Sequence, residues 1–239
     1  MIKQIQSHLK TLSSKEKQAV LQRFFKTGKG EYGQGDIFIG VTVPQIRKVS
    51  RQYQDASLDD TIQLLKSPIH EERLAALLIL IFQFTKAGHY GKKKIYDLYL
   101  KHTKYINNWD LVDLSAHHIV GAFLEGKDKN ILQKLASSKL LWDRRIAIIA
   151  TFYFIRRNQY HDTLMIAKQL LNDKEDLMHK ALGWMLREIG KRDLVTEEKF
   201  LKDHYRKMPR TMLRYAIERF PEEKRQAYLQ GTINSCVKP

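Results

Sequence analysis

The chain contains three tryptophans, and each stands near an ionisable residue at helical spacing. Residues three or four positions apart share one face of a helix. The pairs are Trp109 with Asp113, Trp142 with Arg145, and Trp184 with Arg187. An indole face attracts cations, a carboxylate stabilises developing positive charge, and arginine binds phosphate. The pattern predicts a surface that binds an anionic polymer and presents aromatic rings to something flat and cationic.

The charge balance points to the same kind of partner. Forty-two Lys and Arg stand against 26 Asp and Glu, which gives a net charge of +16 and a sequence pI near 9.8. Such an excess is typical of proteins that bind a polyanion such as nucleic acid. The apolar content of 43% and the charged content of 28% are those of a globular protein, which argues against disorder.

Membrane and secreted classes are disfavoured. The longest apolar run, residues 74–82, is about half of the roughly 18 residues that a spanning helix needs. The amino terminus has no signal-peptide apolar region. Cys236 is the only cysteine, so the chain can form no internal disulfide and no cysteine metal cluster. We expect a cytoplasmic, DNA-associated protein with no membrane contact.

Apolar residues recur at intervals of three and four along most of the chain, which predicts helices, and no useful strand alternation occurs. Helix starts are predicted at Ser13, Ser57, Asn108 and Thr196, whose side chains suit the N-cap position. The fold class expected is all-α.

The helices repeat. The segment 68–77 is similar to the second helix of a HEAT unit, and related starts follow at Trp109, Trp142, Leu177 and Pro209. Stacked antiparallel pairs of this kind form a curved solenoid (an α-α superhelix), here with a basic concave face. We expect a single HEAT-like repeat domain over 1–239, with a glycine-rich loop at 27–40 and a short tail at 231–239.

The helix that starts after Asn108 carries the strongest chemical signal. Trp109 and Asp113 fall together at the margin of its apolar stripe, whereas Asp110 is placed further round, toward solvent. A partly desolvated carboxylate beside an indole would act strongly on a nearby cation. The structural alternative is a tryptophan packed between repeats and an aspartate that favours the first turn of a helix.

The sequence lacks the motifs of metal sites, phosphate-binding loops and serine hydrolases. No His-Glu-x-x-His spacing occurs, and the adjacent His117 and His118 point to different sides of a helix. The glycine-rich loop lacks the Gly-x4-Gly-Lys spacing of a phosphate-binding loop, and no Gly-x-Ser-x-Gly is present. We expect no metal and no cofactor.

Three segments together resemble the HEAT-like-repeat alkylpurine DNA glycosylases, the AlkD family. They are Trp109-Asp110-Leu111-Val112-Asp113, Trp142-Asp143-Arg144-Arg145, and the stretch from Lys180 to Glu188. The resemblance implies Asp113 as the catalytic carboxylate, Trp109 and Trp184 around the damaged nucleotide, and Arg145 on the DNA backbone near the lesion. It also implies DNA contacts by further basic residues, namely Arg47, Lys180, Arg187 and Arg214.

The implied activity is hydrolysis of the N-glycosidic bond of cationic N3- or N7-alkylated purines in double-stranded DNA, by a monomer without a lyase step. The resemblance implies that the damaged base stays stacked in the duplex, whereas glycosylases generally extrude the base. The alternative is a non-enzymatic HEAT-repeat module that binds nucleic acid through its basic face. A carboxylate amid phosphates favours the enzyme, because it would only repel DNA in a pure binder. A protein-binding scaffold is a third hypothesis and predicts indifference to nucleic acid.

Overall fold

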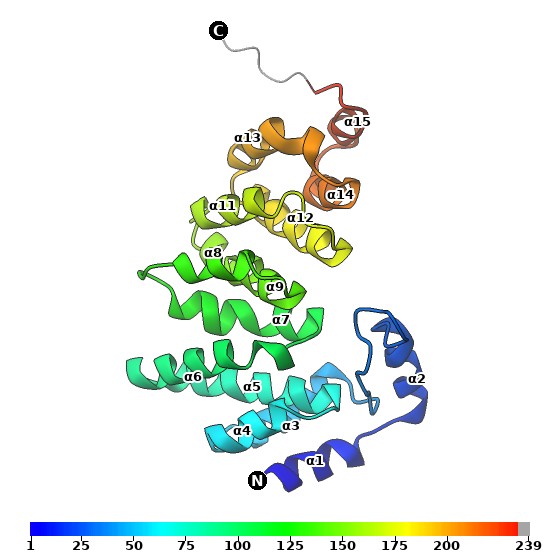
Figure 1. Ribbon diagram of the computed structural model, residues 1–239, viewed down its shortest axis with the longest axis vertical. Coiled ribbons are helices and arrows are strands. Elements are labelled where there is room, and N and C mark those ends of the chain that lie inside the picture. Colours follow the sequence, from blue (N-terminus) through cyan, green and yellow to red (C-terminus); the bar gives the residue numbers. More distant parts are fainter. Residues whose placement is uncertain (234–239) are drawn as a thin grey trace. The chain divides into compact units, whose positions relative to one another are not determined.

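The computed structural model describes residues 1–233, which are almost entirely helical or turn (Figure 1). Within this part of the chain the only β-type pairing is one isolated parallel bridge between Ile37 and Ile69. The all-α prediction is confirmed. The end of the predicted tail, including Cys236, lies outside the described residues.

The chain forms two compact units, and the second begins at Leu124. The α-helices of the first unit are α1 (Ile2–Thr11), α2 (Lys15–Phe24), α3 (Val43–Gln52), α4 (Leu58–Leu65), α5 (His70–Lys86), α6 (His89–Lys101) and α7 (Trp109–Ala116). Those of the second are α8 (Asn130–Ala136), α9 (Leu141–Ala150), α10 (Phe152–Ile155), α11 (His161–Gln169), α12 (Asp176–Gly190), α13 (Leu194–His204), α14 (Arg210–Ala216) and α15 (Glu222–Gln230). Short turns of 3-10 helix are η1 (Thr103–Tyr105), η3 (Tyr205–Lys207) and η4 (Ile217–Arg219), and η2 (His117–Gly121) is a π-turn that continues α7.

In the first unit α5 is the central helix, and α3, α4 and α7 all pack against it. Its residues Leu74 to Leu80 are buried on every side. A helix surrounded by neighbours needs apolar residues all round, which explains why this run shows no amphipathic alternation. The first turn of α5 is different, because it buries four consecutive ionisable residues, 70–73.

In the second unit α12 is central, and α9, α13 and α14 pack against it. A Cβ atom on Gly183 would lie 2.4 Å from the carbonyl oxygen of Met212. Only glycine therefore lets the backbones of α12 and α14 approach this closely.

The predicted helix starts are right where the cap is local and unambiguous. The side chain of Ser57 accepts a hydrogen bond from the amide of Asp60, and that of Asn108 accepts from Trp109. Two starts are wrong. Ser14, one residue after Ser13, caps α2. Asp193 caps α13, so Thr196 lies inside that helix and donates its hydroxyl to the Asp193 carboxylate.

The glycine-rich loop 27–40 is anchored to the start of α5 through Glu71. The carboxylate of Glu71 accepts hydrogen bonds from the amides of Ile39, Gly40 and Val41, at distances of 2.8 to 3.2 Å. Backbone bonds from Ile37 to the Pro68 carbonyl and from His70 to the Ile37 carbonyl complete the attachment.

We expect Glu71→Ala to lower the free energy of unfolding by about 3 kcal/mol, because three amides lose a charged acceptor in a place that water barely reaches. Glu71→Gln should lower it less, since its amide oxygen still accepts. Equilibrium urea unfolding measures both. The control is Glu223→Ala, which removes an exposed carboxylate and should change the free energy of unfolding by no more than about 0.5 kcal/mol. An equal loss of stability in Glu71→Ala and Glu223→Ala would contradict the anchoring role.

Candidate functional site

The first turn of α7 carries the two residues expected to do chemistry. Asn108 precedes the helix in extended conformation and caps it by accepting from the Trp109 amide at 2.8 Å. Trp109 and Asp113 are one turn apart and both half-buried. Burial raises the pKa of the nearby Tyr99, its hydrogen bond to Ser115 lowers it, and the charge of Asp113 adds a smaller increase. The Asp113 carboxylate therefore lies near Tyr99 in a partly desolvated position.

The indole of Trp109 is fixed by residues that lie far away in sequence. Its ring stacks on Phe25, with centroids 5.3 Å apart and planes inclined by 19°, and it meets Phe24 edge-on. Its Nε1 donates a hydrogen bond to the hydroxyl of Tyr32 at 3.2 Å. The stack continues through Phe38 to the ring of His70. The contact residues come from the end of α2 and from the glycine-rich loop.

A buried polar network lies beneath this stack. The Asp36 carboxylate accepts from Arg73 Nη2 at 2.6 Å, from Asn108 Nδ2 at 3.0 Å and from the Nδ1 side of His70 at 3.1 Å. The other ring nitrogen of His70, Nε2, lies 2.8 Å from Asp110 Oδ2. The network joins the glycine-rich loop, α5 and α7 at one point.

Both ring nitrogens of His70 face a carboxylate oxygen, and ionised carboxylates only accept hydrogen bonds. The two contacts are therefore satisfied together only by the imidazolium. Burial disfavours that charge, but the charge of Asp110 and the hydrogen bonds to both carboxylates outweigh it and raise the pKa of His70. The pKa of Asp36 is lowered, because the bonds from His70 and Asn108 and the charge of Arg73 exceed the effect of burial.

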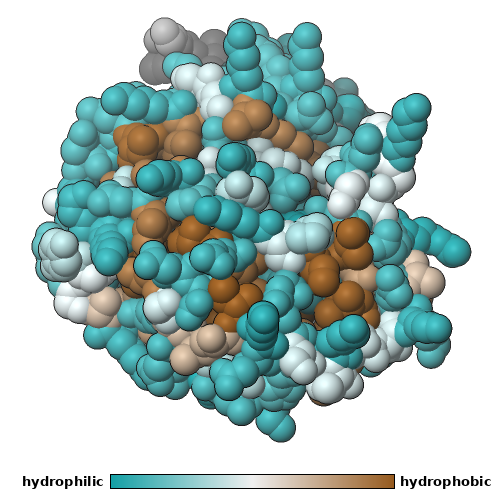
Figure 2. All heavy atoms as spheres, turned by 60° about the horizontal axis from the view of Figure 1, so that its bottom comes forward, coloured by the Kyte–Doolittle hydropathy of each residue, from teal (hydrophilic) through white to brown (hydrophobic). Residues whose placement is uncertain are grey.

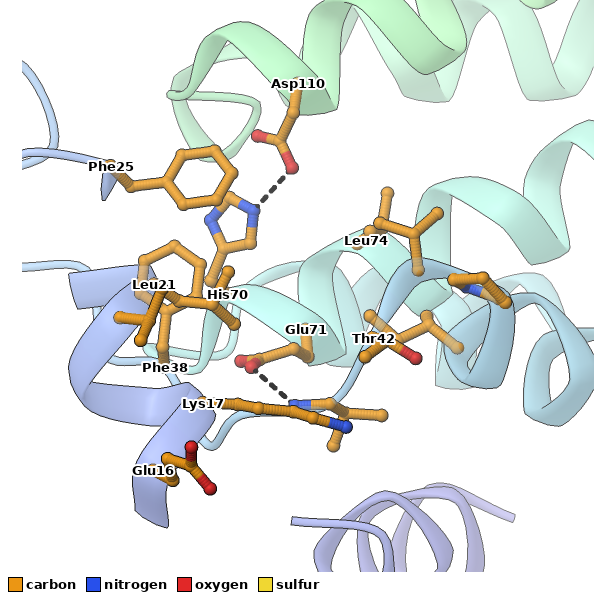
Figure 3. A pocket seen from close by; sticks show the side chains of 15 residues that line it. Glu16, Lys17, Leu21, Phe25, Phe38, Thr42, His70, Glu71, Leu74 and Asp110 are labelled. Carbon is orange, nitrogen blue, oxygen red and sulfur yellow. Dashed lines mark hydrogen bonds and ion pairs between the residues drawn. The ribbon is translucent and has the colours of Figure 1, made fainter. Parts of the chain in front are cut away.

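Asp110 was expected toward solvent, and this prediction is wrong. The residue is 7% exposed and points to His70 across the first unit. Its second oxygen, Oδ1, accepts no hydrogen bond from the described residues. Figure 3 shows Asp110 reaching His70 beside Phe25, at one end of a cavity of ≈ 470 Å³ lined mainly by apolar side chains. Helical periodicity places Asp110 off the apolar stripe of its own helix, but a partner 40 residues away draws it inside.

The second unit holds the other predicted catalytic residues. Arg145, in α9, is 4% exposed, and its Nη1 donates to the carbonyl of Leu177 in the first turn of α12 at 2.5 Å. Trp184, in α12, is half-buried beside Phe152 and donates from Nε1 to Glu188 at 3.3 Å. The two residues therefore belong to helices that pack against each other. Trp142 is also half-buried.

The four basic residues expected to contact the DNA backbone differ in whether they form ion pairs within the protein. Lys180 pairs with Asp176 at 2.8 Å, and Arg187 pairs with Glu218. Arg47, in the first unit, and Arg214, in the second, are exposed. On the face in Figure 2 most of the surface is hydrophilic, with apolar side chains in separate patches. Neither arginine forms an ion pair with a described residue, so each is available for an anionic ligand.

Sequence reasoning missed Asp36, His70 and Arg73. The available signal was the run of four ionisable residues, 70–73, directly before the most apolar stretch of the chain. Charged residues are almost never fully buried unless they are paired, so that run predicts a buried network without naming its partners. In residues 1–233 no group of three or more His, Cys, Asp or Glu side chains is arranged to hold a metal ion. No helix described in the structure has both the length and the apolar character needed to cross a membrane.

Comparison with known proteins gives one family. The sequence profile described as DNA alkylation repair enzyme matches residues 5–220. The fold is similar to a solved structure described as "Predicted DNA alkylation repair enzyme from Enterococcus faecalis", with a TM-score of 0.67 and 14% identity. That match covers 88% of this chain and 97% of the other. No curated protein sequence matches the chain.

Proposed function

Because the chain belongs to the DNA alkylation repair enzyme family, we propose that it is a monofunctional glycosylase for cationic N3- and N7-alkylated purines in duplex DNA. The observation that carries the proposal is the half-buried Asp113 one helical turn from Trp109, in a protein of net charge +16. The family match supports DNA repair, and the geometry of α7 supports the reaction type.

The chemistry follows from the substrate. Alkylation at N3 or N7 leaves a positive charge on the purine, so the base departs with the electron pair of the glycosidic bond and becomes neutral without a general acid. The sugar is left with oxocarbenium character, which the Asp113 carboxylate stabilises. Water bonds to the anomeric carbon and releases a proton toward the same carboxylate. No lysine addition is required, so the product is an abasic site and a free base.

The tryptophans and arginines have separate roles in this proposal. The faces of Trp109 and Trp184 attract the cationic nucleotide, and the base stays stacked in the duplex. The family resemblance assigns Arg145 to the backbone near the lesion, but the residue is 4% exposed and its Nη1 donates to Leu177, which ties α9 to α12. Arg47 of the first unit and Lys180, Arg187 and Arg214 of the second extend the phosphate contacts.

The direct test is release of methylated bases from methylated duplex DNA, with 3-methyladenine and 7-methylguanine scored separately by chromatography. We expect one or both to be released together with abasic sites, and no strand cleavage. Tight DNA binding without any base release would favour the non-enzymatic nucleic-acid-binding module.

Replacing Trp109 or Trp184 by Ala should reduce excision more than binding to undamaged DNA, because an indole face meets the cation only at a lesion. The stability effect separates this from packing, since truncation of a buried tryptophan costs roughly 3–5 kcal/mol. Excision rate, affinity and melting temperature should be measured on the same samples. A melting temperature that falls in step with activity would assign both tryptophans to packing.

Replacing Arg47 or Arg214 by Gln should each reduce the slope of log affinity against log salt by about 0.9, the value for one phosphate contact on duplex DNA. Both are exposed, so the substitution disturbs no core. Fluorescence anisotropy on duplexes of two unrelated sequences should give the same change. Lys3→Gln on α1 is the control, and equal slopes for all three variants would remove these arginines from the interface.

A further inference from the structure

The position of Trp109 depends on the glycine-rich loop 27–40. Its ring stacks on Phe25 and meets Phe24 edge-on at the end of α2, directly before the loop, and its Nε1 donates a hydrogen bond to Tyr32 within the loop. Its backbone is held from the same side, because Asn108, which caps its helix, donates to Asp36. The loop therefore reaches Trp109 through the indole nitrogen and through the helix cap, while the rings that precede the loop pack against the indole.

Asp36 is the residue of the loop on which the other elements converge. It is 5% exposed and accepts hydrogen bonds from Arg73 and His70 of α5 and from Asn108 before α7. A buried carboxylate is stable only when its charge is paired and its oxygens are hydrogen-bonded. The hydrogen bonds from these three partners therefore hold the loop against α5 and against the residue that caps α7.

His70 links this point to the helix that carries Asp113. Its ring is 2% exposed and bonds to Asp36 on one side and to Asp110, the residue after Trp109, on the other. Asp110 Oδ1 accepts no hydrogen bond from the described residues. The contact of Oδ2 with His70 is therefore the main interaction that stabilises the buried carboxylate of Asp110. A neutral imidazole carries one N–H and would leave one of the two carboxylates without its donor.

We propose that Asp36 and His70 are positioning residues: the imidazolium bridge between Asp36 and Asp110 holds the first turn of α7 against the glycine-rich loop and so sets the orientation of Trp109. The expected effect on excision rests on the proposed glycosylase function, whereas the effect on the orientation of Trp109 does not. The bridge gives the loop a role, which is to aim the aromatic group that meets the nucleotide.

The bridge should respond to pH. The charged groups that face His70 are Asp36 from the loop, Asp110 from α7 and Arg73 from its own helix, while the uncharged rings of Phe25 and Phe38 cover it. When His70 loses its proton, one of its two carboxylate bonds is lost, and Trp109 gains freedom. Because the pKa of His70 is raised, the change should occur above pH 6.5.

The three tryptophans allow a direct test on the full chain. Incorporation of 5-fluorotryptophan gives one fluorine NMR resonance for each, which Trp→Phe variants assign. We expect the Trp109 resonance to move with a midpoint above pH 6.5, and that movement to disappear in His70→Gln. Trp142 and Trp184 serve as internal references. A Trp109 resonance with the same position and the same pH response in the native chain and in His70→Gln would overturn the proposal.

A matched control separates positioning from general loosening. Gln83, also in α5, bonds to the carbonyls of Gln54 and Ala56, away from Trp109. Gln83→Ala should leave the Trp109 titration unchanged, and loss of the titration in this variant too would contradict the proposal. If His70→Gln does not fold, Asp36→Asn takes its place. The Trp109 titration of Asp36→Asn is then compared with that of the native chain, and an identical titration would contradict the proposal.

Excision supplies the second readout. In His70→Gln we expect kcat to fall about a hundredfold at pH 7, the effect of a small misalignment, with KM for damaged duplex little changed. The native rate should decline on the alkaline side with the midpoint of the Trp109 resonance. If the native chain excises no base, the glycosylase proposal fails while the NMR titration still decides the positioning role. A kcat unchanged in His70→Gln would overturn the role in excision.

Discussion

Asp113→Asn should abolish base excision, with a loss of about two to three orders of magnitude in the single-turnover rate, while affinity for duplex DNA stays the same or rises. The amide has the shape of the carboxylate but no charge to stabilise the oxocarbenium ion. In the ground state that charge repels the phosphate backbone, so its removal should not weaken binding to undamaged duplex DNA. Excision of 7-methylguanine and fluorescence anisotropy on the matching undamaged duplex measure the two quantities.

The control for this variant is Asp97→Asn, which removes an exposed carboxylate of the same unit that pairs with Lys93. It should retain the native rate. Full activity in Asp113→Asn would assign the chemistry to another carboxylate. Asp110 would be the first to test, although its burial and its bond to His70 suit a supporting role better.

Glu197→Gln should make the protein markedly more resistant to unfolding at alkaline pH. Glu197, in α13, is 1% exposed, and its Oε1 accepts no hydrogen bond from the described residues. Burial, reinforced by the charge of Glu198 and opposed by that of Arg187, raises its pKa from 4.5 to about 8. The native fold therefore holds the neutral acid, and ionisation favours the unfolded chain.

The sign follows from linkage. The stability that the protonated Glu197 provides is complete below pH 4.5 and is lost as pH rises to about 8, at about 1.4 kcal/mol per pH unit. The advantage of Glu197→Gln over the native chain should grow by about 4 kcal/mol between pH 5 and pH 8. Urea unfolding at several pH values measures it, with the exposed Glu175→Gln as control. A difference independent of pH would show that Glu197 is ionised in the fold.

The sequence predicts this site where interactions are local. The Asn108 cap and the shared face of Trp109 and Asp113 depend on residues within one turn of a helix, and the structure confirms both. The position of Asp110 and the network of Asp36, His70 and Arg73 depend on contacts between residues 34 to 72 positions apart. Helical periodicity carries no information about which distant segment will pack against a given turn.

In the glycine-rich loop, too, the burial of individual side chains depends on contacts with distant residues. Glycines at 28–40 predict a segment without regular structure, and this holds for most of it. Composition alone does not reveal that Asp36 and Phe38 in this segment are buried. Their burial is set by Glu71 and His70, which belong to α5 and bind the loop from outside.

In the proposed reaction the protein cleaves the glycosidic bond of a base that is already cationic. The most direct measurement compares single-turnover formation of abasic sites in two identical duplexes, one with N7-methylguanine and one with the neutral damaged base hypoxanthine. We expect rapid excision of the cation and none of the neutral base, because the proposed mechanism supplies no proton to the leaving base. Equal excision of both bases, or of neither, would contradict it.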